Sequence, residues 1–263
     1  MGSIMKGIIS FDLDMTLLDH KTMEIPESAM KAIEMLRDRF QIVVASGRDM
    51  DAAYSRRFRD QIQPDAIIHL NGTKITVGEQ LIYNHNMDKK LLGRLLEYAE
   101  QKNYGLGVSI DDKDYYITPE RIVENDMDFW GESHRDFQDP WALMDLGVRT
   151  LCYVGGEDGA KDIEEHFPEL KLPMFAGKKG ADVVEQQASK AEGLIRLCDY
   201  FNVDISNTAA FGDSMNDYEI IREAGIGIAM GNAFEELKKA ADYVTSGVDN
   251  DGIWNACVHF GWI

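Results

Sequence analysis

Cysteine is scarce in this sequence, and its placement excludes a disulfide framework. Only Cys152, Cys198 and Cys257 occur among 263 residues. Their odd number and wide spacing match neither paired disulfides nor the short intervals of a zinc motif. We therefore expect reduced thiols in a cytoplasmic protein.

Long apolar runs and excess basic charge are also lacking. No run approaches the roughly 18–20 apolar residues that span a membrane, and the N-terminus shows no signal-peptide pattern. Lysine and arginine number 27 against 46 aspartates and glutamates, which gives a net charge of −19. This charge disfavours nucleic acids and anionic membranes as partners. An anionic small molecule would need strongly positive surroundings at its site.

Repeats, low-complexity tracts and proline-rich linkers are absent, so hydrophobic periodicity has to reveal the organisation of the chain. Towards both ends, short apolar runs alternate with amphipathic segments. Strands are predicted from Gly7 and at 41–46, 65–70, 208–212, 226–230 and 242–245. Helices are predicted at 26–40, 49–60, 190–201, 215–225 and 233–241. This alternation is typical of an α/β parallel sheet with helices on both faces.

The middle of the chain has a different pattern. Helices are predicted at 89–101, 119–130 and 160–167, and a strand at 149–155. Two pairs of strands, 105–110 with 114–118 and 171–177 with 181–187, flank short turns and indicate hairpins. We therefore predict a core domain of residues 1–82 and 187–263, with an α+β domain inserted at 83–186.

The first predicted strand ends in two aspartates. In "GIISFDLDMTLLD" (7–19), Asp12 and Asp14 stand at alternate positions, so they point to one side, roughly 6–7 Å apart. Ligands of open α/β sheets bind at this end of the strands. On this fragment alone, a solvated pair of aspartates is as good a prediction as a binding site.

Other polar side chains follow strands or begin helices at the same predicted edge. They are Ser46, Gly47 and Arg48 after one strand, Asp213, Asn216 and Asp217 after another, and Lys190 at the start of a helix. Ordinary alternatives exist: Ser46 could begin a helix, Asp217 could cap one, and Lys190 could be solvated. A lysine at a helix start opposes the helix dipole by about 0.3–1 kcal/mol.

Together these groups suit phosphoryl transfer. Oxygen ligands from several carboxylates are those that Mg²⁺ prefers. An aspartate can attack phosphorus and form an aspartyl-phosphate, and the reaction otherwise needs positioning and charge neutralisation. A metal ion and Lys190 would make the site locally positive within an acidic protein.

The order of "DLDMT", "SGR", "SK" and "GDSMND" resembles that of haloacid dehalogenase superfamily phosphatases. The late stretch "IGIAMGNAFEELKKAADYVTSGVDNDGI" is similar to their Cof-type sugar phosphatase branch. The resemblance covers about 160 residues of the predicted core. It implies a Rossmann-like core domain with an inserted cap of the C2B type.

The resemblance also implies residue roles. Asp12 is expected to be the nucleophile and Asp14 the general acid/base. Metal ligands are expected at Asp12, Asp14 (through its carbonyl), Asp213 and Asp217. Phosphate contacts are expected at Leu13, Ser46, Gly47, Lys190 and Asn216.

The implied activity is a Mg²⁺-dependent phosphatase that hydrolyses small phosphate monoesters, chiefly sugar phosphates, through an aspartyl-phosphate. A phosphomutase of the same superfamily is one alternative. A phospho-accepting or binding module without turnover is another, although such a module needs neither the acid Asp14 nor an inserted domain. The sequence leaves the oligomeric state open.

The inserted domain is expected to act as a lid that excludes water and admits compact substrates. Five of its residues are candidate partners for substrate hydroxyls or a second anionic group: Lys178, Lys179, Trp130, His134 and Arg135. For any one of them, a plain surface-loop role is the stronger prediction.

Two positions depart from the family pattern. Met15 and Ala191 stand where glycine is usual. If residue 15 needs a positive φ, Met15 costs roughly 1–2 kcal/mol.

Overall fold

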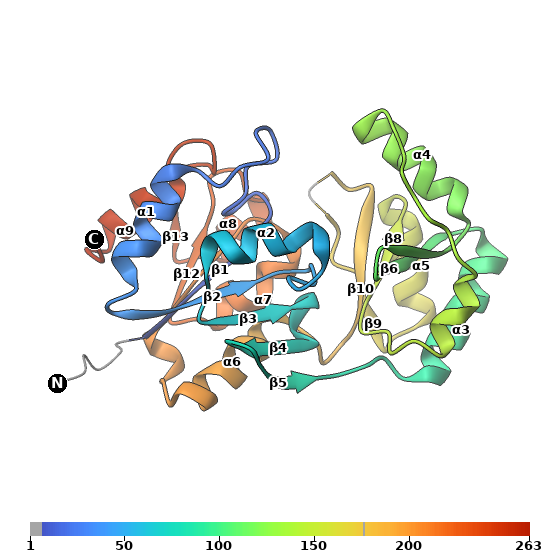
Figure 1. Ribbon diagram of the computed structural model, residues 1–263, viewed down its shortest axis with the longest axis horizontal. Coiled ribbons are helices and arrows are strands. Elements are labelled where there is room, and N and C mark those ends of the chain that lie inside the picture. The colour runs from blue at the N-terminus through green and yellow to red at the C-terminus, as the bar shows by residue number, and fades with distance from the viewer. Residues whose placement is uncertain (1–6, 176) are drawn as a thin grey trace. The chain divides into compact units, whose positions relative to one another are not determined.

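The computed structural model describes residues 7–175 and 177–263, and the chain forms two compact units (Figure 1). The first comprises Met1–Asn84 and Ala188–Ile263, and the second comprises His85–Gln187. The second unit starts two residues later than the predicted inserted domain, 83–186, and ends one residue later. The chain therefore crosses between the units twice.

The first unit is built on an eight-stranded sheet in the order β13-β12-β11-β1-β2-β3-β4-β5. Its strands are β1 (Gly7–Phe11), β2 (Phe40–Ala45), β3 (Ala66–His69), β4 (Lys74–Val77), β5 (Gln80–Asn84), β11 (Thr208–Gly212), β12 (Ile226–Ala229) and β13 (Tyr243–Val244). The strands from β13 to β3 are parallel, and β4 and β5 follow antiparallel. Every residue of β1 is buried, as expected for a strand covered on both faces.

Helices pack on this sheet in groups. They are α1 (Glu27–Leu36), α2 (Ala53–Ile62), α6 (Lys190–Phe201), α7 (Tyr218–Glu223), α8 (Glu235–Ala240) and α9 (Gly252–His259). Short 3₁₀ turns are η1 (Leu70–Gly72), η3 (Ile205–Asn207) and η4 (Met215–Asp217). Helix α1 packs on α9, and α7 packs on α6 and α8. The buried residues of α1, Ala29, Ala32, Ile33 and Leu36, form one stripe at helical spacing.

Several elements differ from the sequence prediction. The helix expected at 49–60 begins at Ala53, because residues 46–52 form a loop in which Asp49 accepts a hydrogen bond from the N–H of Asp51. The helix expected at 215–225 is divided into η4 and α7. Strands β4 and β5 and helix α9 were not predicted. A two-residue turn at Gly78, whose φ is 54°, joins β4 to β5.

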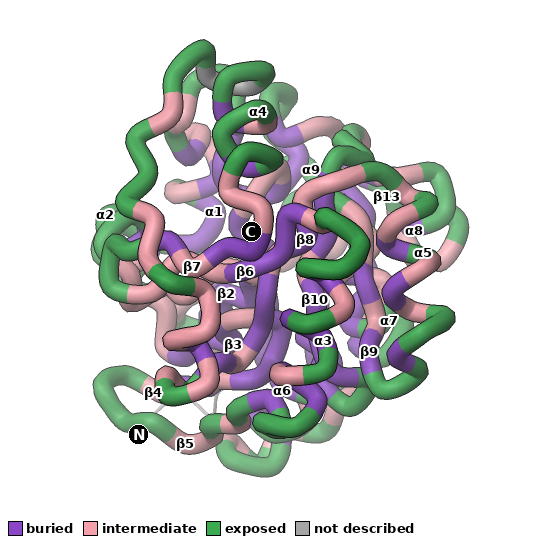
Figure 2. The backbone as a smooth tube through the Cα atoms, turned by 90° about the vertical axis from the view of Figure 1, so that its right-hand side faces the viewer, coloured by how far each residue is buried: buried purple, intermediate pink, exposed green. Residues whose placement is uncertain are grey.

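The second unit has an antiparallel sheet in the order β7-β6-β8-β10-β9. Its strands are β6 (Gly105–Ile110), β7 (Lys113–Ile117), β8 (Leu151–Val154), β9 (Leu170–Lys171) and β10 (Gly180–Glu185). Its helices are α3 (Lys89–Lys102), α4 (Pro119–Trp130) and α5 (Glu157–His166), with the 3₁₀ turn η2 (Pro140–Met144). The unit has a hydrophobic core of its own, and most of β10 is buried, as Figure 2 shows.

The second predicted hairpin is shorter than expected. Strand β10 pairs with β9 only at Leu170 and Lys171, followed by a single bridge between Met174 and Ala181. Pro173 lies between these two contacts and has no N–H to donate to a ladder. Ala176 lies outside the described residues. Within the part of the chain that is described, every helix is too short or too polar to cross a bilayer.

Candidate active site

The candidate site lies at the carboxyl ends of neighbouring parallel strands. Asp12 directly follows β1, Asp213 follows β11 and Ser46 follows β2, and these three strands are adjacent. The N–H of Asp12 donates to the carbonyl of Phe211 at 3.0 Å, which continues the pairing of β1 with β11. Ligands of open α/β sheets bind at this edge.

Lys190 is the cation of the site. Its side chain has no exposed surface, and Nζ lies 2.7 Å from Oδ1 of Asp12 and 2.6 Å from Oδ1 of Asp217. The alternative of a solvated lysine is therefore wrong. Ser189 caps α6 by accepting the N–H of Glu192 at 3.1 Å, which fixes the helix start that carries Lys190.

Three buried carboxylates gather around this ammonium group. Asp12, Asp213 and Asp217 each offer an oxygen within 4.8 Å of the others. Burial raises the pKa of Asp12 to about 8. The positive charge of Lys190 lowers this pKa, and the negative charges of Asp217 and Asp14 raise it further. Burial and the neighbouring Asp12 likewise raise the pKa of Asp213 well above its usual value. When all three are ionised, Lys190 leaves two negative charges uncompensated, and this all-oxygen set matches a hard divalent cation.

Asp217 has two functions at once. Its Oδ2 accepts the N–H groups of Asp213 at 3.0 Å and Ser214 at 3.1 Å, so it completes a capping box, while Oδ1 binds Lys190. Gly212 makes this possible, because a Cβ there would lie 2.5 Å from the Asp217 carboxyl carbon. The capping alternative and the ionic role are thus both present in one side chain.

Asp14 is held by two basic side chains. Arg48 donates from Nε to Oδ2 at 2.8 Å and from its second terminal nitrogen to Oδ1, and Nε2 of His20 lies 2.6 Å from Oδ1. Burial raises the pKa of Asp14, but the contacts with His20 and Arg48 outweigh it, and the pKa lies below its usual range. The sequence pattern predicted no specific role for Arg48, although it stands in the "SGR" motif.

The remaining predicted phosphate contacts lie in the turns after β1 and β2. Ser46 is buried, and its Oγ accepts the N–H of Arg48 at 3.1 Å. It does not begin a helix, since α2 starts seven residues later. Gly47 is half-buried. The carbonyl of Leu13 accepts the N–H groups of Leu17 and Leu18, so it closes the turn after Asp12.

Asn216 lies in η4 beside the turn that follows β3. Its Nδ2 donates to Oδ1 of Asn71 at 3.2 Å, and its Oδ1 accepts the hydroxyl of Ser214 at 2.8 Å. Asn71 was not predicted as a site residue. The only sequence signal for it was its position directly before Gly72, after an apolar strand.

The chain is similar to known proteins. The family model of haloacid dehalogenase-like hydrolases matches residues 9–257. The chain belongs to this family. YkrA of Bacillus subtilis strain 168 is 30% identical, with 97% of each chain covered.

Solved structures of the family match both units. BT1666 from Bacteroides thetaiotaomicron, described among phosphatases of the superfamily, has a TM-score of 0.88 at 28% identity and covers 100% of this chain, which covers 97% of it. BT4131, a subclass IIB sugar phosphatase, has the same TM-score and identity, with coverage of 98% and 100%. The protein is therefore a phosphatase with the haloacid dehalogenase fold.

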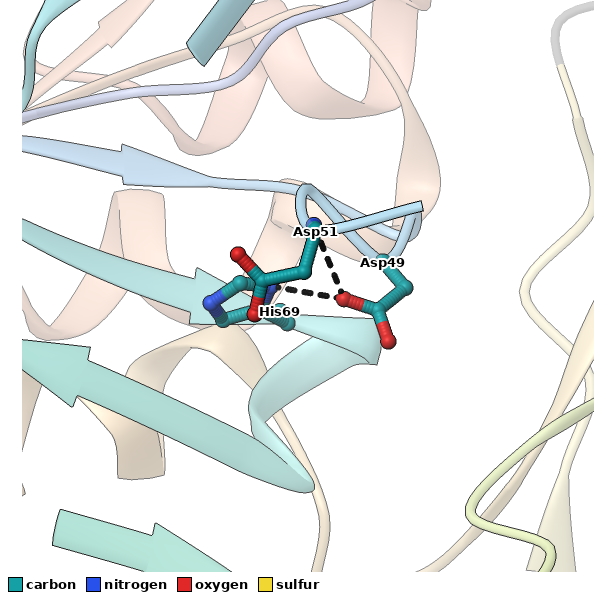
Figure 3. Close-up of side chains that lie close together, drawn as sticks. All are labelled: Asp49, Asp51 and His69. Atoms are coloured by element: carbon teal, nitrogen blue, oxygen red, sulfur yellow. Dashed lines mark hydrogen bonds and ion pairs between the residues drawn. The ribbon is translucent and has the colours of Figure 1, made fainter. Parts of the chain in front are cut away.

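A second cluster of potential metal ligands lies next to this family site. Figure 3 shows Asp49 accepting the N–H of Asp51, with its Oδ1 3.1 Å from Nδ1 of His69. Lys74 binds both carboxylates, at 2.9 and 2.7 Å, and Arg59 binds Asp51. Two carboxylates thus face two cations, and burial lowers the pKa of His69, so the ring stays neutral. The cluster needs no metal ion to balance its charge and anchors the loop 46–52 to β3 and β4.

The candidate residues of the second unit form ion pairs within that unit. Lys178 pairs with Glu157 at 2.7 Å, Lys179 with Asp128 at 3.2 Å, and His134 with Glu132 at 3.2 Å. Arg135 binds Asp126 through two nitrogens and also contacts Asp114. The side chain of Trp130 lies outside the described part of the structure.

The two positions that depart from the family pattern have different consequences. Met15 has a φ of 58°, so a left-handed backbone is present where glycine is usual. For a residue with a Cβ this costs about 1–2 kcal/mol. Ala191 is buried in the first turn of α6 and adopts ordinary helical geometry.

Proposed function

We propose that this phosphatase hydrolyses small phosphate monoesters of the sugar phosphate class, with Mg²⁺, through an aspartyl-phosphate on Asp12. The observation that carries the proposal is the fully buried Lys190 between Asp12 and Asp217, in a cluster of three carboxylates that has two excess negative charges when all three are ionised. A divalent cation would neutralise this charge, which protonation of Asp12 and Asp213 relieves when no metal is bound.

The donor set suits Mg²⁺. Asp12, Asp213 and Asp217, with the backbone carbonyl of Asp14, would hold the ion through oxygen atoms alone. When bound, the ion supplies positive charge to the oxygens of the phosphoryl group. Lys190 supplies a second positive charge from the protein itself, in surroundings where burial strengthens it.

Asp12 is the proposed nucleophile. Lys190 orients its carboxylate by donating to Oδ1. A carboxylate oxygen of Asp12 forms a bond to phosphorus as the bond from phosphorus to the ester oxygen breaks. The cysteines are unsuited to this task, because burial raises the pKa of Cys152 to about 12, of Cys198 to about 11 and of Cys257 to about 12. Their thiols stay protonated at neutral pH.

Asp14 is the proposed acid and base. In the first half-reaction its carboxyl proton goes to the leaving oxygen, and in the second its carboxylate takes a proton from the water that attacks the aspartyl-phosphate. Arg48 and His20 hold the carboxylate in the ionised form, which is the form that activates water. The acid form requires release from Arg48, so we place that release at substrate binding.

Small substrates are supported by the second unit. The likeness to the sugar phosphatase BT4131 extends over 98% of this chain and so includes His85–Gln187 as well as the core. We propose that this unit is the cap that selects the leaving group. The contacts that we propose for sugar hydroxyls or a second anion are Lys178, Lys179, Trp130, His134 and Arg135.

The test is phosphate release from a panel of hexose and pentose phosphates by wild type, Asp12→Asn and Asp199→Asn in Mg²⁺. Asp199 is an exposed aspartate of α6 and serves as the matched control. We expect Asp12→Asn to abolish turnover, because an amide cannot act as this nucleophile, and Asp199→Asn to retain it. Near-normal release by folded Asp12→Asn would refute the mechanism. Transfer of phosphate back to sugar without release would favour a phosphomutase.

A further inference from the structure

The turn after β3 has an unusual backbone. Leu70, Asn71 and Gly72 have φ values of 50°, 53° and 92°, so three consecutive residues are left-handed. Residues other than glycine avoid this region, and such strain persists where the surrounding structure fixes it, often at functional sites. A Cβ on Gly72 would lie 2.1 Å from the carbonyl oxygen of Ser189, the residue before Lys190. The turn is therefore packed directly against the start of α6.

Asn71 connects two parts of the site. It is 3% exposed; its N–H donates to the carbonyl of Ser46 at 3.1 Å, and its Oδ1 accepts Nδ2 of Asn216 at 3.2 Å. Ser214 fixes the other end of the Asn216 carboxamide through Oδ1. The orientation of the Asn216 carboxamide is thus set at both ends. One partner is Ser214, two residues away, and the other is Asn71, 145 positions away in the sequence.

We infer that Asn71 is a positioning residue for phosphate recognition, an inference that rests on the proposed function. Nδ2 of Asn216, like any carboxamide nitrogen, carries two N–H donors. One of them donates to Oδ1 of Asn71, and the structure assigns the second to an oxygen of the substrate phosphate. The side chain of Asn71 and its backbone keep the Ser46 turn in register with Asn216. Asn71 acts through these residues and does not itself touch the reacting atoms.

Asn71→Gly is the decisive variant, because glycine keeps the left-handed backbone and removes only the carboxamide. Asn202→Gly is the matched control, since Asn202 is also left-handed, with φ 52°, but ends α6 in the same unit. We expect Asn71→Gly to lower kcat/KM by 10–100-fold and to raise the inhibition constant of inorganic phosphate by at least tenfold. Asn202→Gly is expected to change neither by more than twofold.

A double-mutant cycle with Asn216→Ala separates positioning from a general loss of structure. If Asn71 acts through Asn216, Asn71→Gly adds less than about threefold in the Asn216→Ala background. Full additivity, or an Asn71→Gly enzyme with unchanged phosphate inhibition, would overturn the inference. The proposed function would still stand in that case if wild type is active and Asp12→Asn is not.

A second measurement needs no folded Asn71 variant. The two side-chain amide protons of Asn216 are followed by NMR in wild type, and Asn216→Ala identifies them by loss of their signals. On addition of inorganic phosphate with Mg²⁺, we expect one proton to shift strongly and the proton bonded to Asn71 to stay nearly in place. Equal shifts of both protons, or of neither at saturating phosphate, would also contradict the inference.

Discussion

Lys190 is a single ammonium group enclosed by carboxylates, with no exposed surface. Lys190→Met keeps a long aliphatic side chain and removes the charge. We expect kcat/KM to fall at least tenfold, equivalent to about 1.4 kcal/mol, because the phosphoryl oxygens lose a preorganised cation. Steady-state kinetics of Lys190→Met and of Lys239→Met, which alters an exposed lysine of α8, would test this. Equal kcat/KM values for the two variants would show that the charge of Lys190 does not contribute to catalysis.

The buried carboxylates also predict how stability depends on pH. Without metal, the folded pKa of Asp12 is raised to about 8, so the folded state binds a proton more tightly than the unfolded state. The contribution of Asp12 to stability is therefore lost as pH rises from its unfolded value through about 8. Asp213, whose pKa is also raised, acts in the same direction.

Bound Mg²⁺ needs these groups ionised, so the stabilisation that it provides should grow over the same pH range. We expect the increase in Tm on adding Mg²⁺, relative to EDTA, to be larger at pH 8 than at pH 5. Thermal melting at several pH values measures this difference, with Asp213→Asn as the variant in which it should shrink. A Mg²⁺ effect that is independent of pH would contradict the coupling.

At the scale of elements, the loop 46–52 owes its shape to Lys74 on β4. Lys74 is the shared partner of Asp49 and Asp51, and the loop carries Ser46 and Arg48 at its start. Lys74→Met leaves both carboxylates without this cation, although Arg59 still binds Asp51. We expect the free energy of unfolding to fall by about 1.5–3 kcal/mol, the range for charged hydrogen bonds.

The same substitution should lower kcat/KM, because the loop also positions the partner of Asp14. Chemical denaturation and kinetics are compared with those of Lys31→Met, an exposed lysine on α1. A loss of stability with unchanged kcat/KM would show that the cluster anchors the loop without aligning the site.

Periodicity located many of these elements but not their partners. Helix α6 and strand β11 have the bounds that the sequence predicts, because their apolar spacing and caps are local signals. The ends of parallel strands then bring Asp12, Asp213 and Lys190 into one neighbourhood. The contacts of Arg48 with Asp14 and of Asn71 with Asn216 join residues 34 and 145 positions apart, and no local pattern specifies them. The sequence did not predict helix α9, because its apolar residues do not form a clear stripe.

At the scale of the whole molecule, the net charge of −19 opposes the approach of an anionic substrate. Screening shortens the range of this repulsion from about 30 Å at 0.01 M salt to about 8 Å at 0.15 M. We therefore expect kcat/KM for a sugar monophosphate to rise between these salt concentrations at constant Mg²⁺, and to rise more for a sugar bisphosphate. A decrease with salt for both substrates would show that the local positive charge of the site dominates the approach.

The pairing of β1 with β11 has a consequence for biosynthesis. Ile8 is opposite Thr208 in the sheet, so the central strand that leads to Asp12 waits for a partner about 200 residues downstream. At synthesis rates of about 5–20 residues per second, that wait lasts roughly 10–40 s. Throughout this time, the backbone edge of β1 that pairs with β11 has no partner. His85–Gln187, which has its own core, can meanwhile fold on the ribosome. We therefore expect the nascent chain to be most exposed to aggregation, and most dependent on chaperones, until β11 has been made.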